Sequence, residues 1–255
     1  MALLSTPAIV LGSMRLGEAD KLITFFTIKR GKLKGVAQGA RRMKSRFGAS
    51  LEPFTHCTLI IFEKGGEKLA RINQTDILHS FQPLREDWSG IESASRMADL
   101  TVHMTPDSEP NPEIFNLLLQ GLTFLEGKKD PILTMMLFIN RLIMYSGYQC
   151  RWDACLKCQY PFKTGVRQTL YFSPSAGGTL CAACAKNTTT LTPLSQSTRA
   201  FLSATQKMDY IQSHRFRPSS DMLKECETLF RQYLAHITGK PIQRFSPQPT
   251  SALHL

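Results

Sequence analysis

The most informative absence in this chain is that of acidic residues near its N-terminus. Between Asp20 and Glu52 there is no carboxylate, while nine lysines and arginines fall in the same interval. They are Lys21, Lys29, Arg30, Lys32, Lys34, Arg41, Arg42, Lys44 and Arg46. An ordinary solvated face does not explain so much charge without a counter-ion. Together with a net charge of +11 for the whole chain, the segment favours a polyanionic partner, either nucleic acid or an acidic membrane surface.

Long hydrophobic runs and a secretory signal are also missing. The most apolar segment, Ile132 to Tyr145, is shorter than the ~20 residues of a spanning helix and contains Asn140 and Arg141, so we expect a buried helix. The N-terminus has no basic region before its apolar residues. Seven cysteines, an odd number, do not suit a secreted disulfide framework. These features predict a cytoplasmic protein.

The sequence lacks the common catalytic motifs. It has no complete P-loop, no His-Glu-x-x-His and no Gly-x-Ser-x-Gly. Its six histidines are scattered along the chain. The acidic segment Leu84 to Trp88 fits the start of a solvated helix better than a nuclease metal site. We therefore expect a binding protein and no enzyme.

Alternating apolar residues and turn signals predict five short strands in the first third of the chain. The expected strands cover residues 8–13, 22–28, 33–38, 54–63 and 69–78. Tight hairpins are expected at Lys29 to Lys32 and at Lys64 to Glu67, whereas a long mobile loop joins the third and fourth strands. This arrangement is typical of an OB-fold barrel, and an SH3-like barrel fits almost as well.

After Pro83 the apolar residues recur at helical spacing. Helices are expected to begin near Pro112 and to cover residues 132–145, 195–208 and 220–237. The predicted fold class is α+β multidomain: an N-terminal five-stranded OB-fold β-barrel followed by an all-helical domain that contains a four-cysteine module. The expected boundaries are 1–81 for the barrel, 82–150 and 191–238 for the two parts of the helical domain, 151–190 for the four-cysteine module and 239–255 for a flexible tail.

Two Cys-x-x-Cys pairs, Cys155 with Cys158 and Cys181 with Cys184, have the spacing of a tetrahedral zinc site. The intervening residues can form a hairpin that brings the pairs together. Four thiolates leave no open position, so one structural Zn²⁺ per chain is expected. Two redox dithiols or four unrelated core thiols are the alternatives, but no βαβ unit, which a redox motif should have, accompanies the cysteines. The remaining cysteines are expected in the core, with Cys150 as a possible spare ligand.

A basic surface holds phosphates, and single strands also require side chains on which bases stack. Phe25, Phe26, Phe47 and Phe54 lie in or beside the basic region, although strand alternation turns one of the first two inward and Phe54 fits a core position. The predicted DNA-binding residues are Lys29, Arg30, Lys32, Lys34, Arg41, Arg42, Lys44, Arg46 and Phe47.

These motifs resemble those of the RecO family of bacterial DNA repair and recombination mediators. The N-terminal pattern consists of Gly17 to Leu22, Lys34 to Ala37, Gly39 to Arg42, Ser45 to Phe47 and Leu51 to Phe54. The C-terminal pattern consists of the two Cys-x-x-Cys pairs and the intervening Phe172 to Gly178. The resemblance extends over residues 5–235. Gln38 departs from it, because family members often carry a cation there.

The resemblance implies an OB-fold, a helical domain and a zinc module that some relatives have lost. It also implies binding of single- and double-stranded DNA, annealing of SSB-coated strands and loading of RecA together with RecR. Contact with the acidic C-terminal tail of SSB requires a pocket rimmed by cations; Arg141 is one candidate, and a buried ion pair is its alternative role. An RNA-binding zinc-ribbon protein of translation or transcription, and a zinc nuclease or redox enzyme, are the competing hypotheses.

Overall fold

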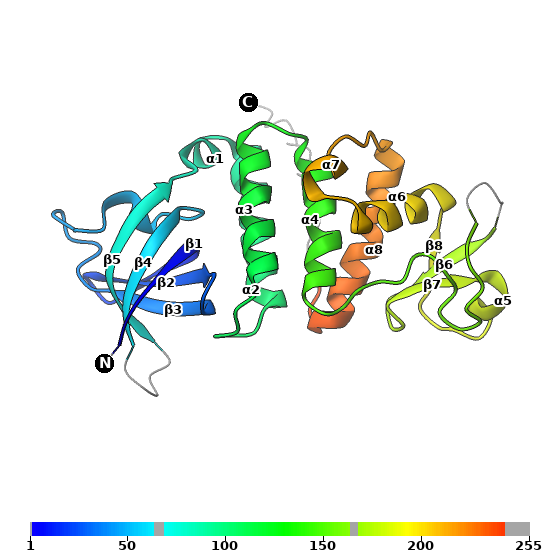
Figure 1. Ribbon diagram of the computed structural model, residues 1–255, viewed down its shortest axis with the longest axis horizontal. Coiled ribbons are helices and arrows are strands. Elements are labelled where there is room, and N and C mark those ends of the chain that lie inside the picture. The colour runs from blue at the N-terminus through cyan, green and yellow to red at the C-terminus, as the bar shows by residue number, and fades with distance from the viewer. Residues whose placement is uncertain (1, 64–68, 164–167, 243–255) are drawn as a thin grey trace, which may run out of the picture. The chain divides into compact units, whose positions relative to one another are not determined.

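The computed structural model describes residues 2–63, 69–163 and 168–242 of the chain (Figure 1). Contacts divide it into two compact units, Met1–Lys129 and Asp130–Leu255. The first unit contains a β-barrel and helices, and the second contains helices and a small sheet. The sequence predicts that residues 82–150 belong to one helical domain, but the helices before residue 130 group with the barrel.

Five strands form the closed barrel of the first unit. They are β1 (Ala2–Leu16), β2 (Asp20–Thr27), β3 (Gly31–Ala37), β4 (His56–Glu63) and β5 (Ala70–His79). Their order around the barrel is β1-β2-β3-β5-β4, with β4 paired to β1 and only the β3–β5 pair parallel among the described strands of this barrel. The predicted OB-fold is confirmed, including the hairpin between β2 and β3. The second predicted hairpin, Lys64 to Glu67, lies outside the described residues.

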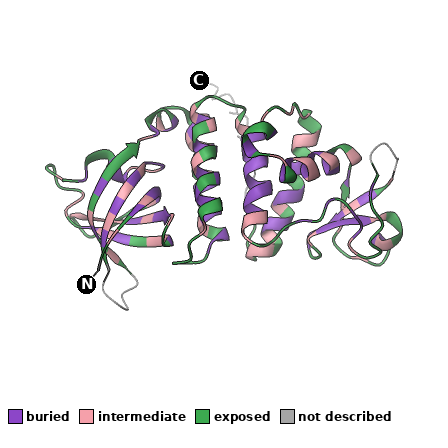
Figure 2. Cartoon of the chain, viewed as in Figure 1, coloured by how far each residue is buried: buried purple, intermediate pink, exposed green. Residues whose placement is uncertain are grey.

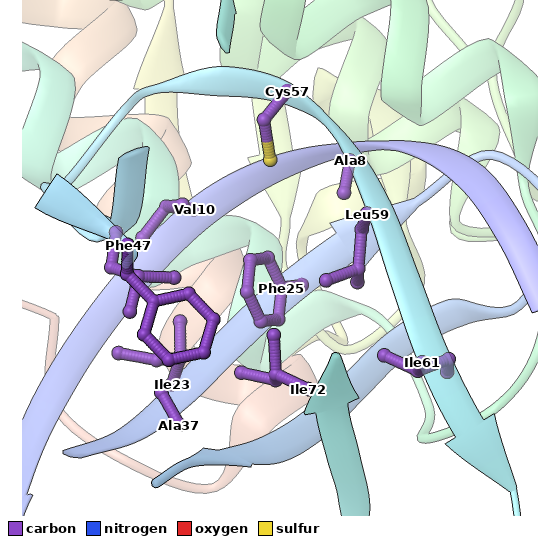
Figure 3. Close-up of a cluster of buried hydrophobic side chains, with 11 residues drawn as sticks. Ala8, Val10, Ile23, Phe25, Ala37, Phe47, Cys57, Leu59, Ile61 and Ile72 are labelled. Carbon is purple, nitrogen blue, oxygen red and sulfur yellow. The ribbon is translucent and has the colours of Figure 1, made fainter. Parts of the chain in front are cut away.

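Alternate residues of the strands fill the barrel interior, because successive side chains of a strand point to opposite faces. Ile23 and Phe25 of β2 and Ile61 of β4 are completely buried there (Figure 3). Strands β3 and β5 approach closely at Gly35, where a Cβ would lie 2.8 Å from Cγ1 of Ile72. Glycine at this position therefore allows the parallel pairing that closes the barrel.

Three helices of the first unit follow the barrel in sequence: α1 (Gln82–Glu86), α2 (Trp88–Met104) and α3 (Pro112–Glu126). The Asp87 carboxylate accepts a hydrogen bond from the backbone N–H of Gly90 at 2.7 Å and so caps α2. The interpretation of the acidic segment as a helix start is confirmed for Asp87, whereas Leu84 to Glu86 form the end of α1. Phe115 of α3 stacks on Phe26 of β2 with 6.5 Å between ring centroids, which packs the helices against the barrel.

Lys32 of β3 joins the barrel to the end of α2. Its ammonium group donates to the carbonyl oxygens of Val102 at 2.7 Å and Thr105 at 2.8 Å, and it lies 3.1 Å from the Asp107 carboxylate. The last carbonyls of a helix lack intrahelical partners and form the negative end of its dipole. The Lys32 side chain is only 12% exposed, so its charge serves this contact within the protein.

The second unit begins with α4 (Pro131–Tyr145), whose residues 133–143 are all buried (Figure 2). The predicted buried helix is confirmed. The other elements are β6 (Leu170–Ser173), β7 (Gly178–Cys181), α5 (Ala182–Ala185), β8 (Thr192–Leu194), α6 (Gln196–Lys207), α7 (Tyr210–Ser213) and α8 (Ser220–Thr238). Helices α6 and α8 pack on α4. Among the described residues, no helix has the length and hydropathy required to cross a membrane.

Arg141 of α4 serves neither of the two roles expected from the sequence, which are contact with the tail of SSB and a buried ion pair. Its guanidinium group donates to the carbonyl oxygen of Thr205 at 2.9 Å, to that of Met208 and to Oγ of Ser213 at 3.3 Å. The described part of the chain offers it no carboxylate partner, so the expected ion pair is wrong. Because the residue is buried and caps the end of α6, it is also not available to an external acidic tail.

The Lys32 contact predicts a selective loss of stability. Lys32→Met removes the charged donor and leaves the α2 carbonyls without a partner, which should lower the free energy of unfolding by about 2 kcal/mol. Lys34→Met is the matched control, because Lys34 is exposed on the same strand. Urea unfolding of both variants measures the difference, and equal stabilities would contradict the assigned role of Lys32.

Candidate nucleic-acid interface and metal centre

The cationic loop, residues 38–55 between β3 and β4, follows a path of successive turns. Backbone hydrogen bonds close these turns at Ala40, Arg42 and Ser45, and the short 3₁₀ helix η1 (Gly48–Leu51) follows. The glycine content of this segment predicts a mobile loop, but the hydrogen bonds give it a defined conformation.

Phe47 anchors the loop in the barrel. Its ring is 4% exposed and lies in the core cluster with Phe25 and Ile23 (Figure 3). The Arg46 guanidinium group lies 4.9 Å from the centroid of this ring and donates to the carbonyl oxygen of Ile72 at 3.4 Å. The hydrophobic contact therefore fixes the position of the neighbouring cation.

Two further contacts tie the start of the loop to the β1–β2 turn. The Asp20 carboxylate accepts a hydrogen bond from the Gly39 backbone N–H at 2.8 Å. The Arg41 guanidinium group donates to the carbonyl oxygens of Gly17 at 3.1 Å and Glu18 at 2.8 Å. Arg41 thus contributes to the shape of the loop as well as to its charge.

The folded loop borders a surface hollow of about 560 Å³. Its lining residues are Asp20, Gln38, Gly39, Arg42, Lys44, Ser45, Arg46 and Arg71. Four of these are cations and one is an acid, whose carboxylate is engaged by Gly39. The Arg42 and Lys44 side chains are exposed, and the described residues provide them with no hydrogen-bond or ion-pair partner. A negatively charged group such as a phosphate would fit this hollow.

The predicted DNA-binding residues do not form one cluster. Lys29 and Arg30 lie in the turn before β3, whereas the cationic loop begins after Ala37, the last residue of β3. Strand β3, roughly 20 Å long, therefore separates Lys29 and Arg30 from the cations of the loop. Lys34 is exposed on β3 itself. Lys32 is the exception already described, because its ammonium group is bonded to α2, and we remove it from the interface.

The prediction that Phe47 contacts bases is not supported, because its ring is in the barrel core. Phe25, Phe26 and Phe54 are at most 2% exposed and are equally unable to stack on bases. Sequence reasoning also missed Arg71 of β5. Its alternation with buried Ile72 indicates a solvent-facing side chain, but the sequence pattern does not give the register that brings Arg71 beside the end of β3 and the loop.

The second candidate site is the cluster of Cys155, Cys158, Cys181 and Cys184. Their four sulfur atoms lie within 4.8 Å of one another, and the Sγ atoms of Cys158 and Cys181 are 3.8 Å apart. Thiolates bound tetrahedrally at ~2.3 Å from a metal have sulfur atoms roughly 3.8 Å apart. The predicted group of four is thus brought together, and it could hold a metal ion.

The hairpin of β6 and β7 positions the two cysteine pairs, as the sequence predicts. Cys181 ends β7, and the backbone N–H of Leu156 donates to the carbonyl oxygen of Thr179 at 3.0 Å. At Gly178, a Cβ would lie 2.8 Å from the carbonyl oxygen of Arg151, so glycine permits this close approach of the two segments.

The four thiols also influence one another's protonation. Burial raises the pKa of the Cys155 thiol, but hydrogen bonds from backbone N–H groups of the cluster outweigh this effect and lower the pKa to about 6. Hydrogen bonds with the other thiols, that with Cys181 being the strongest, raise the pKa of Cys184 to about 12. Four thiols this close cannot all ionise unless a cation balances their charge.

These features define a multidomain OB-fold protein with a cationic loop and a four-cysteine site. A family model described as Recombination protein O N terminal matches residues 1–81, and one described as Recombination protein O C terminal matches residues 85–244.

Curated relatives give the same result. The DNA repair protein RecO of Thermoanaerobacter sp. (strain X514) is 30% identical over 236 residues, which cover 92% of each chain. The corresponding protein of Bifidobacterium animalis subsp. lactis (strain AD011) is 31% identical over 95% of this chain and 98% of the relative. The DNA repair protein RecO of Myxococcus xanthus (strain DK1622) is 37% identical over 177 residues, which cover 69% of this chain and 70% of the relative. The chain belongs to the RecO family, which gives it a role in DNA repair and recombination.

The cysteine geometry predicts which thiols are required for metal binding. Replacing Cys155 and Cys181 by Ser should reduce the bound metal from one ion per chain to nearly none, because each pair loses a ligand. Cys150→Ala is the control, since Cys150 is not part of the cluster. Elemental analysis of the purified proteins measures the metal content. Retention of one ion per chain by the double variant would contradict the assignment.

Proposed function

We propose that this chain binds single- and double-stranded DNA and anneals complementary strands, as a recombinational repair mediator that catalyses no chemical step. The observation that carries the proposal is the hollow beside the cationic loop. Four cations line it, and Arg42 and Lys44 have no described partner for their charge. Family membership supports the repair role and DNA as the ligand, and the charge distribution supports a polyanion.

Annealing is a process that such a surface can promote by electrostatics. Two strands repel each other through their phosphates, and cations that replace condensed counter-ions reduce this repulsion. Contacts to phosphates leave the base edges available for pairing. This step requires no nucleotide hydrolysis, and the free energy of base pairing drives it.

We propose further that the four-cysteine cluster holds one structural Zn²⁺. Sulfur ligands in a tetrahedral arrangement suit zinc, and four protein ligands leave no position for a substrate or water. The ion would stabilise the hairpin and the cysteine turns of the second unit. A zinc nuclease or a redox enzyme is disfavoured, because the first requires an open coordination position and the second requires thiols that are not bound to metal.

The proposed partners come from the family resemblance. They are the acidic C-terminal tail of SSB, RecR, and indirectly RecA, which would be loaded onto SSB-coated DNA. A protein with these partners would act in the cytoplasm, at the nucleoid. Because Arg141 is buried at the end of α6, we do not include it in the contact with SSB.

Annealing of SSB-coated complementary oligonucleotides in the absence of nucleotide tests the proposal. Arg42→Glu with Lys44→Glu should reduce the annealing rate at least tenfold, because it reverses two charges in the hollow. Neither side chain has a hydrogen-bond or ion-pair partner in the part of the chain that the structure describes. Lys128→Glu with Lys129→Glu is the control, since it makes the same change of charge in an exposed turn outside the hollow.

A wild-type protein that anneals neither coated nor naked strands would exclude the mediator function. Equal loss of activity in both variants would show that net charge matters and the hollow does not. Preferential displacement of DNA by an RNA of the same sequence would favour the RNA-binding alternative.

A further inference from the structure

The pairing registers of the barrel place one residue of each strand in a row across its outer surface. Leu3 of β1 is opposite Phe62 of β4, and Phe62 is opposite Arg71 of β5. Arg71 is beside Val36 of β3, and Val36 is opposite Leu22 of β2. We call these five residues the outer row. Apart from Arg71, all of them are apolar.

The outer row faces away from the core. Ile61 and Ile72, the sequence neighbours of Phe62 and Arg71, belong to the buried cluster, so alternation directs the latter two outward. Leu3 is 60% exposed and Phe62 is 37% exposed. The solvent face of such a sheet is ordinarily polar, and adjacent exposed apolar side chains on it indicate an interaction surface.

Arg71 connects the outer row to the cationic hollow, because it belongs to both. Side chains directly opposite each other on neighbouring strands have Cβ atoms ~5 Å apart, so the side chains of Phe62 and Arg71, a cation of the hollow, leave the sheet next to each other. An aromatic face beside a groove that holds phosphates is the combination by which proteins bind single strands. No such combination exists for Phe25, Phe26, Phe47 or Phe54, which are buried.

We propose that the bases of single-stranded DNA lie on the outer row, with Phe62 as the stacking platform and Arg71 between the bases and the phosphates held in the hollow. This inference rests on the proposed function and specifies where the bases are bound. Bases inside a duplex are already stacked on one another, so the outer row contributes affinity for single strands and little for duplexes. Stacking on a flat ring also leaves the pairing edges of the bases accessible.

The test compares a single-stranded oligonucleotide with an abasic oligonucleotide of the same length and charge. Phe62→Ala should weaken binding of the normal oligonucleotide roughly tenfold and leave binding of the abasic one unchanged. Phe62→Trp should restore affinity, and its fluorescence should be quenched by the normal oligonucleotide alone. Ile211→Ala, at a side chain 58% exposed in the second unit, is the control.

The outcomes separate this inference from the proposed function. If Phe62→Ala binds both oligonucleotides like the wild type, or loses affinity for both equally, Phe62 is not a base contact and the inference is overturned while the proposed function stands. If the wild type binds neither oligonucleotide nor duplex DNA, the proposed function is overturned and this inference with it. Circular dichroism of Phe62→Ala shows whether the barrel remains folded.

Discussion

The insertion of the Phe47 ring into the barrel is the interaction on which the candidate interface depends. Without this anchor, a glycine-containing segment would keep the conformational entropy of a disordered chain, and its cations would repel one another. With the ring buried, Arg46 is held against it, the turns of the cationic loop are fixed, and Arg42 and Lys44 are directed to one hollow. The conformational cost of ordering the loop is therefore met by hydrophobic burial, before any polyanion is bound.

Much of the architecture could be predicted because it follows from local patterns. Alternation and turn glycines identify the strands, helical spacing identifies the buried α4, and the spacing of two Cys-x-x-Cys pairs identifies the group of four thiols. The individual roles of charged residues could not be predicted in the same way. A sequence shows that Lys32 and Arg141 are cations, but it does not show that unpaired carbonyls at the ends of α2 and α6 lie within their reach. Phe62 and Arg71 become neighbours only through the register of β4 and β5.

The chain thus uses its positive charge in two ways. Lys32 and Arg141 are buried or nearly so, and each stabilises the negative end of a helix within its own unit. Arg42 and Lys44 have no comparable internal partner among the described residues, and their desolvation by a ligand would be compensated by phosphate oxygens. The four-cysteine cluster belongs to the other compact unit, so removal of a metal ion held there would affect the fold of that unit and leave the hollow formed.

The most direct test of phosphate binding in the hollow is the salt dependence of oligonucleotide binding. For single strands, the logarithm of the binding constant falls with the logarithm of salt concentration with a slope of about −0.7 for each phosphate contact. Neutralising Arg42 and Lys44 as Gln should therefore make the slope shallower by about 1.4, if both side chains hold phosphates. An unchanged slope, with the loop still folded, would show that the hollow does not contact the DNA backbone and would contradict the role proposed for the cationic loop.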